Sequence, residues 1–475
     1  MITKNFTAKK ILFLSTCIIF LSFAAYFYAK KRNNFLDFYQ SMTDREIIYG
    51  VHSTPEAEKD WMVILKALYD KNHFTAVDYQ RTEFKIPPII HHIWLGSEMP
   101  QAYKEIRETW FEHHPEFIFK LWDDSQVEPF GLENKNLYDL ARNYGEKSDV
   151  FRYEILRRYG GTYSDTDVFC LKPFNVLHST HDFYTGIMNA GEVLVAIGVL
   201  GSAPNYPFLD SVIRGIEDKG SKYDTVSIME RTGPIHFTKV FVKVAPSLQG
   251  NIIAYPATYF YPVPNLIRGS QCQQNAHKFI KPESFTVHYW ECSWMHPHAF
   301  QIKKIAQSEN SYFHKEGIDK FLDEHFENKK SGTFVDINCT DYVEKNISLF
   351  FEKNRNWSGI CTQPKMNIFK RIANNRNSFC TRCSLNGGSS GLKNYNLHEL
   401  LNLCKFEKID LLCLQSENAY EILKNINYNK AKIDVLCIKT DDITKIKELL
   451  LSRHFHQIKN INDYWIFKAN TGRYS

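Results

Sequence analysis

Short apolar runs alternate with segments of helical spacing between residues 85 and 167. Apolar spacing predicts helices over 102–113 and 137–144. Ser148 and Asp149 form a good N-cap pair and predict the start of a third helix, which Gly160 and Gly161 end. Three runs bounded by Pro, Gly or Asp each predict a buried strand: 86–96, 117–122 and 162–164. This alternation predicts an α/β sheet.

A second alternation of strands and helices begins at Thr333. Apolar runs predict strands over 334–337, 358–362, 378–383, 409–414, 433–438 and 464–467. Segments of about ten residues between them predict helices over 342–353, 365–374, 418–425 and 442–453. Apolar strands separated by helices of this length predict a doubly wound, Rossmann-like domain.

The N-terminus carries one long uncharged run, residues 11–29, with Lys and Arg on both sides. At 1.5 Å per residue this run is long enough to span a bilayer, so we predict a transmembrane signal-anchor behind an N-terminal tail, 1–10. The alternative is a cleaved signal peptide, although the run is longer than a usual apolar core of such peptides. An uncleaved anchor predicts a single-pass type II membrane protein, with a lumenal body in the Golgi if the source is eukaryotic.

The patterns divide the rest of the chain into four parts. Residues 30–80 are mixed and charged and predict a stem with a short helical lead-in to the first domain. Residues 81–302 form the first α/β domain, 303–331 a helical linker, and 332–475 the Rossmann-like domain. A length of 475 residues fits two to three domains.

Composition narrows the function only slightly. The chain is 44% hydrophobic and 23% charged, which is typical of a globular protein. A net charge of +5 over this length argues against nucleic-acid binding. The sole C-x-x-C, Cys380 to Cys383, has no second pair at zinc-finger spacing, so a zinc site is not predicted.

The most informative motif is Asp165-Thr166-Asp167, at the end of a predicted strand. Two carboxylates at this spacing can both face one divalent cation, and hard oxygen ligands suit Mn²⁺ or Mg²⁺. Such a cation neutralises a departing nucleoside diphosphate. A D-x-D is common by chance, and the alternative is a solvated turn.

The preceding helix strengthens the metal interpretation. Asp149 and Arg152 are three residues apart and share one helix face. They are candidates to grip the donor sugar's hydroxyls, and the alternative is a surface ion pair of little energetic consequence.

Several motifs, in order, resemble glycosyltransferase family 32, the D-x-D sugar-binding transferases that include yeast-type mannosyltransferases. The resemblance covers about residues 85–295, and the matching segments are 92–96, 121–124, 148–167, 232–234 and 288–294. It implies a GT-A-like fold, a nucleotide-sugar donor, a glycan or glycolipid acceptor and retention of anomeric configuration. Residues 195–197 read Val-Ala-Ile where the family often has an Asn, which puts the donor in doubt.

The resemblance also implies roles for individual residues. Trp94 would stack on the nucleotide base, and Trp294 would contact the diphosphate. His288 or Ser293 would complete the metal shell of Asp165 and Asp167. Together with Asp149 and Arg152, these residues form the predicted catalytic, donor-binding and metal-binding set.

The second domain resembles FkbM-like methyltransferases without their cofactor-binding residues. The first loop is Asp336-Ile-Asn-Cys-Thr-Asp-Tyr342, lacking two glycines that the family uses to approach S-adenosylmethionine. Gln363 stands in place of the ribose-binding acid, and we therefore expect a non-catalytic module. Asn338, Asn346 and Asn356 each begin a glycosylation sequon, which would place the domain in a secretory lumen if used.

These observations predict a membrane-anchored, metal-dependent retaining glycosyltransferase. It would transfer a hexose from GDP-mannose or a UDP-hexose to a glycan or glycolipid. Two alternatives remain open: a membrane-tethered methyltransferase with a sugar-binding first domain, and a non-catalytic scaffold.

Overall fold

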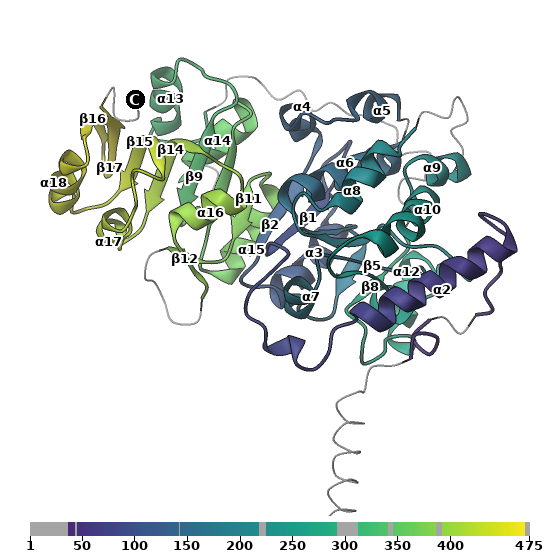
Figure 1. Ribbon diagram of the computed structural model, residues 1–475. Coiled ribbons are helices and arrows are strands. Elements are labelled where there is room, and N and C mark those ends of the chain that lie inside the picture. The colour runs from purple at the N-terminus through teal and green to yellow at the C-terminus, as the bar shows by residue number, and fades with distance from the viewer. Residues whose placement is uncertain are drawn as a thin grey trace, which may run out of the picture.

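The computed structural model describes residues 37–42, 45–141, 143–217, 225–291, 312–340, 345–385 and 392–470 (Figure 1). The predicted anchor, 11–29, lies outside these residues. Within the part of the chain that is described, no helix combines the length and apolar character needed to cross a membrane.

The first half of the chain forms a mixed sheet in the order β2-β1-β3-β6-β5-β7. Its strands are β1 (Ile89–Ile93), β2 (Ile118–Trp122), β3 (Gly161–Ser164), β5 (Phe183–Gly186), β6 (Val199–Ser202) and β7 (Ile252–Tyr255). β1 runs parallel to β2 and β3, whereas β6 is antiparallel to β3 and β5. β4 (Val168–Cys170) and β8 (Thr286–His288) form a separate antiparallel pair.

Helices cover this sheet and supply much of its core. They are α3 (Gln101–His113), α4 (Val127–Phe130), α5 (Lys135–Leu140), α6 (Tyr144–Tyr159), α7 (Asn175–Thr180), α8 (Pro207–Arg214), α9 (Thr225–Arg231), α10 (Pro234–Val244), α11 (Ala257–Phe260) and α12 (Gly269–Asn275). The 3₁₀ turns are η1 (Asp78–Gln80), η2 (Asp124–Gln126), η3 (Ala245–Ser247) and η4 (Ala276–Lys278). The strands and helices predicted between residues 86 and 164 are all present, with shifted ends.

Part of the predicted stem belongs to this folded body. Residues 55–72 form α2 (Pro55–Asn72), which starts with Thr54 as N-cap and Pro55 at its first position. Its buried face packs on β7, where Asn72 Nδ2 donates to the Ile252 carbonyl at 2.7 Å. The short helical lead-in predicted in this segment is therefore a helix of 18 residues, and the mixed polar composition concealed its length because only one of its faces is apolar.

The third predicted helix, α6, begins four residues before Ser148. Asn143 is the N-cap, and its side chain accepts from the Glu146 amide at 2.8 Å. The prediction of an N-cap at Ser148 and Asp149 was therefore wrong, and both residues lie within the helix. Gly160 ends the helix with φ +65°, and Gly161 follows with φ +92°. A Cβ on Gly161 would lie 2.5 Å from the Ile89 carbonyl oxygen, so this position requires glycine.

The second half has the predicted doubly wound order, β11-β10-β9-β14-β15, extended by β17 and β16. Its strands are β9 (Thr333–Ile337), β10 (Ser358–Thr362), β11 (Phe379–Thr381), β14 (Lys408–Gln415), β15 (Lys432–Lys439), β16 (Phe455–Ile461) and β17 (Tyr464–Ala469), with β12 (Ser384–Leu385) and β13 (Asn394–Tyr395) as a small pair. Its helices are α13 (Ile318–His325), α14 (Ile347–Asn354), α15 (Met366–Asn375), α16 (Leu397–Leu403), α17 (Ala419–Lys424) and α18 (Thr444–Ser452).

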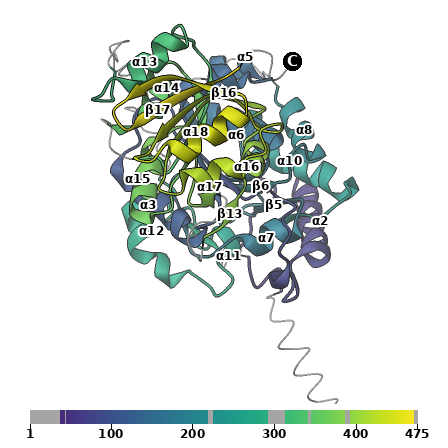
Figure 2. The ribbon, with the colours of Figure 1, turned by 90° about the vertical axis from the view of Figure 1, so that its left-hand side faces the viewer.

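The two halves share one 13-stranded sheet. β11 pairs antiparallel with β2, with Phe379 opposite Lys120 and Thr381 opposite Ile118. Figure 1 shows the sheet continuing from β9 through β11 and β2 to β1, and Figure 2 looks at it from the end where α17 and α18 lie nearest the viewer. The pairing covers an edge of each half that would otherwise expose unpaired backbone groups.

The predicted linker also contributes to the second half. Residues 318–325 form α13, and Asp323 and Arg355 make a buried ion pair at 2.6 Å between α13 and the end of α14. A buried carboxylate needs such a partner, so this part of the linker is fixed to the domain that follows it.

Candidate active site

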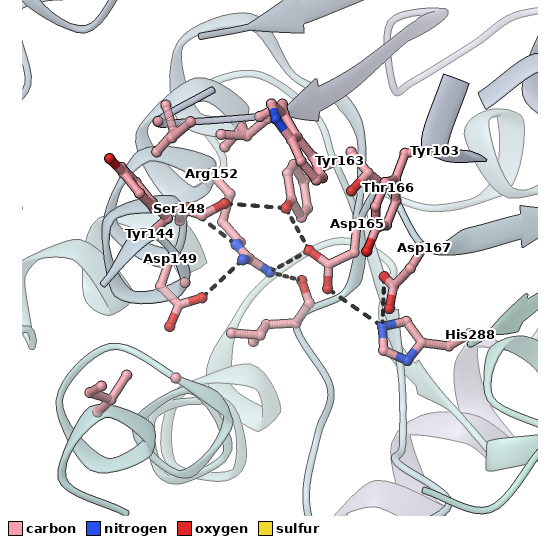
Figure 3. Close-up of a pocket in the computed structure, with 18 of the residues that line it drawn as sticks. Tyr103, Tyr144, Ser148, Asp149, Arg152, Tyr163, Asp165, Thr166, Asp167 and His288 are labelled. Atoms are coloured by element: carbon pink, nitrogen blue, oxygen red, sulfur yellow. Dashed lines mark hydrogen bonds and ion pairs between the residues drawn. The ribbon is translucent and has the colours of Figure 1, made fainter. Parts of the chain in front are cut away.

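The carboxyl ends of β1 and β3 open into a cavity of about 500 Å³ (Figure 3). The loop after β1, the first turns of α6, the segment after β3, the turn before α10 and the end of β8 all line it. Ligands of open α/β sheets bind at the carboxyl ends of the strands. The predicted D-x-D motif lies in the wall of this cavity.

Asp165, Asp167 and His288 form a compact cluster there. One potential ligand atom from each lies within 4.8 Å of the other two. The pairing of β4 with β8 explains the arrangement, because it places Val168, the residue after Asp167, opposite His288. A strand pair therefore brings a histidine more than 100 residues away beside the motif, and the solvated-turn alternative is wrong for these aspartates.

Each carboxylate uses one oxygen within the protein and leaves the other for the cluster. Asp165 Oδ1 accepts from the Tyr163 hydroxyl at 2.5 Å, and Oδ2 lies 3.7 Å from His288 Nε2. Asp167 Oδ2 accepts from the Glu291 amide at 3.0 Å, and Oδ1 lies 3.3 Å from the same nitrogen. Two carboxylate oxygens and one imidazole nitrogen thus converge, and this set fits Mn²⁺ or Mg²⁺.

The protonated form of His288 and the ionised forms of Asp165 and Asp167 stabilise one another. Burial acts to lower the pKa of His288, but Asp167 and Asp165 outweigh it and raise that pKa to about 9. Burial acts to raise the pKa of Asp167, but His288 and the Glu291 amide hold it below its ordinary value. A bound cation would occupy the position of the histidine proton, so proton and metal compete for this site.

Two residues predicted for this site, Ser293 and Trp294, lie outside the described residues. The nearby Trp290, which the sequence did not single out, packs edge-on against His288 with ring centroids 4.2 Å apart. Its Nε1 donates to the Val263 carbonyl at 3.0 Å, and its φ is +54°. Trp290 thereby restrains the imidazole, a role for which the sequence gives no spacing rule.

Asp149 and Arg152 share one face of α6, as predicted, and both are about 95% buried. Arg152 Nη2 lies 3.0 Å from Asp149 Oδ1, and Nη1 lies 3.2 Å from Asp165 Oδ1 (Figure 3). Nη1 also donates to the Ile197 carbonyl at 2.9 Å. The surface-pair alternative is wrong, because the buried guanidinium joins the buried carboxylate of Asp149 to the half-buried one of Asp165 on the cavity wall.

Burial raises the pKa of Asp149 to about 7, although Arg152 opposes the shift. Thr232 Oγ1 also favours the charged form by donating to Asp149 Oδ2 at 3.1 Å. Thr232 lies two residues before Pro234, the first residue of α10. The sequence did not connect Thr232 to Asp149, because 83 residues separate them.

Trp94 also lines the cavity and is partly exposed. Its ring packs on Tyr103 of α3, with centroids 4.7 Å apart, and its Nε1 donates to Ser97 Oγ at 3.2 Å. This places an aromatic pair beside the site where a planar base could stack.

In the second half, Gln363 bonds to backbone groups on both sides of it, including the segment that follows β9. Gln363 Nε2 donates to the Cys339 carbonyl at 2.8 Å, and Gln363 Oε1 accepts from the Lys365 amide at 3.0 Å. Arg376 donates to Ser348 Oγ at 3.1 Å from beneath the same loop. The polar groups of Gln363 are therefore already satisfied within the protein.

The carboxylate–imidazole cluster, on a cavity at the strand ends of an α/β sheet, is a candidate site for a divalent cation. Residues 100–184, which include Asp149, Arg152, Asp165 and Asp167, match the family model described as a glycosyltransferase sugar-binding region containing a DXD motif. This part of the chain is a DXD-containing glycosyltransferase domain.

Similar proteins support this assignment. Inositol phosphoceramide mannosyltransferase 2 of Schizosaccharomyces pombe is 29% identical over 33% of this chain and 47% of its own. A mannosyl phosphorylinositol ceramide synthase of Saccharomyces cerevisiae is 30% identical over 33% of this chain and 42% of its own. An uncharacterised glycosyltransferase of Acanthamoeba polyphaga mimivirus is 27% identical over 48% of this chain and 90% of its own. The chain thus spans about half the length of the yeast relatives it matches.

Proposed function

We propose that this protein is a membrane-anchored, metal-dependent, retaining glycosyltransferase. It transfers a hexose from a nucleotide sugar, GDP-mannose or a UDP-hexose, to a glycan or glycolipid acceptor. One observation carries the proposal: Asp165, Asp167 and His288 converge on a cavity whose facing wall holds the buried pair Asp149 and Arg152.

Different residues of the cavity would bind different parts of the donor. Asp165, Asp167 and His288 would hold Mn²⁺ or Mg²⁺, which supplies positive charge to a departing diphosphate. Asp149 presents a carboxylate that can accept hydrogen bonds from sugar hydroxyls, and Arg152 keeps it oriented. Trp94 offers a ring face to the nucleotide base. Arg152 and the restrained imidazole fix these groups before substrate arrives, which is the basis of electrostatic preorganisation.

The remaining wall is apolar and suits an acceptor. Ile197, Ile228, Met229 and Pro234 line the cavity near Asp149. Carbohydrate rings present apolar faces of C–H groups, and such faces pack on side chains of this kind. The names of the yeast relatives describe mannosyl transfer to inositol phosphoceramides, so mannose is the first candidate for the donor sugar and a glycolipid the first candidate for the acceptor.

The second half is better assigned a supporting role than a methyl-transfer role. Its loop after β9 lacks two glycines expected of a cofactor site, and Gln363 bonds to the loop's own backbone. A methyltransferase would need the space beside the loop after β9 to be open to S-adenosylmethionine. Binding of S-adenosylmethionine, measured by calorimetry on the full-length chain, distinguishes the two roles, and we expect none.

The decisive experiment is donor hydrolysis by the full-length chain with Mn²⁺ across a panel of GDP- and UDP-sugars. We expect one donor to be hydrolysed, with loss of activity on chelation and in Asp167→Asn. Asp139→Asn, which changes an exposed carboxylate paired with Lys135, is the matched control. If no donor is turned over and no nucleotide binds in a metal-dependent way, the glycosyltransferase proposal is wrong and the non-catalytic scaffold is favoured.

A further inference from the structure

The second half of the chain reaches the turn after β2 through Asn377, which follows α15. Asn377 Nδ2 donates to Asp123 Oδ2 at 2.6 Å. The Asn377 carbonyl oxygen accepts from Gln126 Nε2 at 2.8 Å and from Lys120 Nζ. Asn377 is only 7% exposed, so these bonds form away from bulk solvent. The turn Asp123–Gln126 is therefore fixed from the side of the second half.

The same turn is connected to the cavity on its other side. Asp123 caps η2 by accepting from the Ser125 amide at 3.0 Å. The next residue, Asp124, accepts from the Gly96 amide through Oδ2 at 2.6 Å. Gly96 belongs to the loop 94–97, which lines the cavity and carries Trp94. A short series of hydrogen bonds thus runs from Asn377 to the rim of the donor site.

The position of Gly96 is tightly constrained. Its φ is +85°, and a Cβ built there would lie 2.2 Å from the ring of Tyr144. The loop backbone therefore rests directly on the first residue of α6, with no room for a side chain. A displacement of Asp124 would move the loop against this ring, so the placement of Trp94 depends on the turn.

Asn377 is itself held by the core of the second half. Its amide donates to Glu352 Oε1 at 3.2 Å, and the same oxygen lies 3.0 Å from Arg376 Nε. Glu352 and Arg376 are both buried. Asn377 is therefore a fixed point rather than a loose surface contact.

We infer that the second half positions the nucleotide side of the donor site, with Asn377 acting through Asp123 and Asp124 on the loop that carries Trp94. The ligand class is a nucleoside diphosphate or its sugar ester, and the inference rests on the proposed function. It gives a methyltransferase-like unit a role in glycosyl transfer that needs no cofactor of its own. Asn377 is a positioning residue, since it lies outside the cavity lining.

The test is calorimetric titration of the full-length chain with GDP and with UDP in the presence of Mn²⁺. We expect Asn377→Ala to weaken nucleoside diphosphate binding by about tenfold, because it removes the hydrogen bonds from Nδ2 to Asp123 Oδ2 and to Ser125 Oγ. Binding of Mn²⁺ alone should stay unchanged, because Asp165, Asp167 and His288 make no contact with the turn. Asn425→Ala is the matched control, since Asn425 is an exposed residue just after α17 whose side-chain Nδ2 donates to the Glu421 carbonyl.

Three further variants distinguish a positioning role of Asn377 from a general loss of folding. Asp124→Ala changes an exposed side chain, and it should reproduce the loss without adding to that of Asn377→Ala. In Asp123→Asn, the side-chain oxygen is needed by the Ser125 amide, so the new Nδ2 faces Asn377 Nδ2 and two donors meet. Combining Asp123→Asn with Asn377→Asp restores a donor opposite an acceptor and should restore affinity. The inference, but not the proposed function, would be overturned if a folded Asn377→Ala binds GDP or UDP like the wild type, or if the double variant does not regain affinity. A wild type that binds neither nucleotide with Mn²⁺ would overturn the proposed function as well.

Discussion

Thr232 and Asp149 join two walls of the cavity, because the Thr232 hydroxyl donates to Asp149 Oδ2 at 3.1 Å. The bond ties the turn before α10 to the middle of α6. It also favours the ionised carboxylate, whose pKa burial raises to about 7. The ionisation of Asp149 therefore falls within the physiological pH range.

This relationship predicts a pH dependence of kcat/KM. If the ionised form of Asp149 binds the donor sugar, activity should rise with an apparent pKa near 7 and level off above it. Thr232→Val removes a hydrogen bond to the charged form, so the rise should shift to higher pH and activity at pH 7 should fall severalfold. The measurement is a pH–rate profile for both proteins.

Ser247→Ala is the control for Thr232→Val, since its hydroxyl donates to the Val244 carbonyl at an exposed position. Its profile should match that of the wild type. An unshifted profile in Thr232→Val would show that Asp149 does not set the pH dependence.

A second prediction concerns His288. His288→Ala removes the nitrogen that lies 3.3 Å from Asp167 Oδ1 and leaves only two carboxylate ligands from the described cluster. Mn²⁺ affinity should fall by at least about tenfold, and donor hydrolysis should fall with it. Calorimetry with Mn²⁺ alone measures the first effect. His277→Ala, an exposed histidine of η4, should bind Mn²⁺ normally, and equal affinity in both variants would remove His288 from the metal site.

The sequence predicted those parts of the fold whose cause is local. The strands around Ile89 and Phe119 follow from apolar runs, and the turn at Gly160 follows from paired glycines. The juxtaposition of Asp165 and Asp167 needs only a strand end. The metal cluster was reached through a family resemblance rather than through periodicity, because pairing of β4 with β8 is a long-range event.

Two features escaped prediction for the same physical reason. The pairing of β11 with β2 and the contact of Thr232 with Asp149 each depend on tertiary contacts between residues far apart in the sequence. No local sequence pattern encodes such contacts. The start of α6 is a different case, because a helix start depends on local sequence and its N-cap was still predicted at the wrong residue. In that case two good N-caps compete, and Asn143 prevails because its helix buries an additional turn including Glu146.

A third prediction follows from Glu352. Burial acts to raise its pKa, but Arg376 and neighbouring donors outweigh it and hold that pKa at about 2, against an ordinary value of 4.5. A depressed folded-state pKa gives stability that is complete above pH 4.5 and is lost as the pH falls towards 2. The shift corresponds to about 3 kcal/mol at most.

Glu352→Gln should therefore lower the melting temperature markedly at pH 7, and the difference from the wild type should shrink between pH 4.5 and pH 2. Thermal unfolding followed at several pH values measures it. Glu421→Gln, on the exposed face of α17, is the control and should show little change at any pH. A difference that stays constant down to pH 2 would contradict this account of the Glu352–Arg376 pair.

The last prediction tests the lumenal location through the three sequons. Asn356 is exposed in the turn between α14 and β10, with φ +56°, and can accept a glycan. Asn346 is only 2% exposed, because its side chain caps α14 by accepting from the Leu349 amide at 2.9 Å. In a secretory host we expect a glycosidase-sensitive mass increment that Asn356→Gln removes. Asn346→Gln should leave the increment intact and instead lower stability by about 1 kcal/mol through loss of the cap. A glycan on Asn346 would contradict its burial, and a protein without any glycan at Asn356 would count against passage through that lumen.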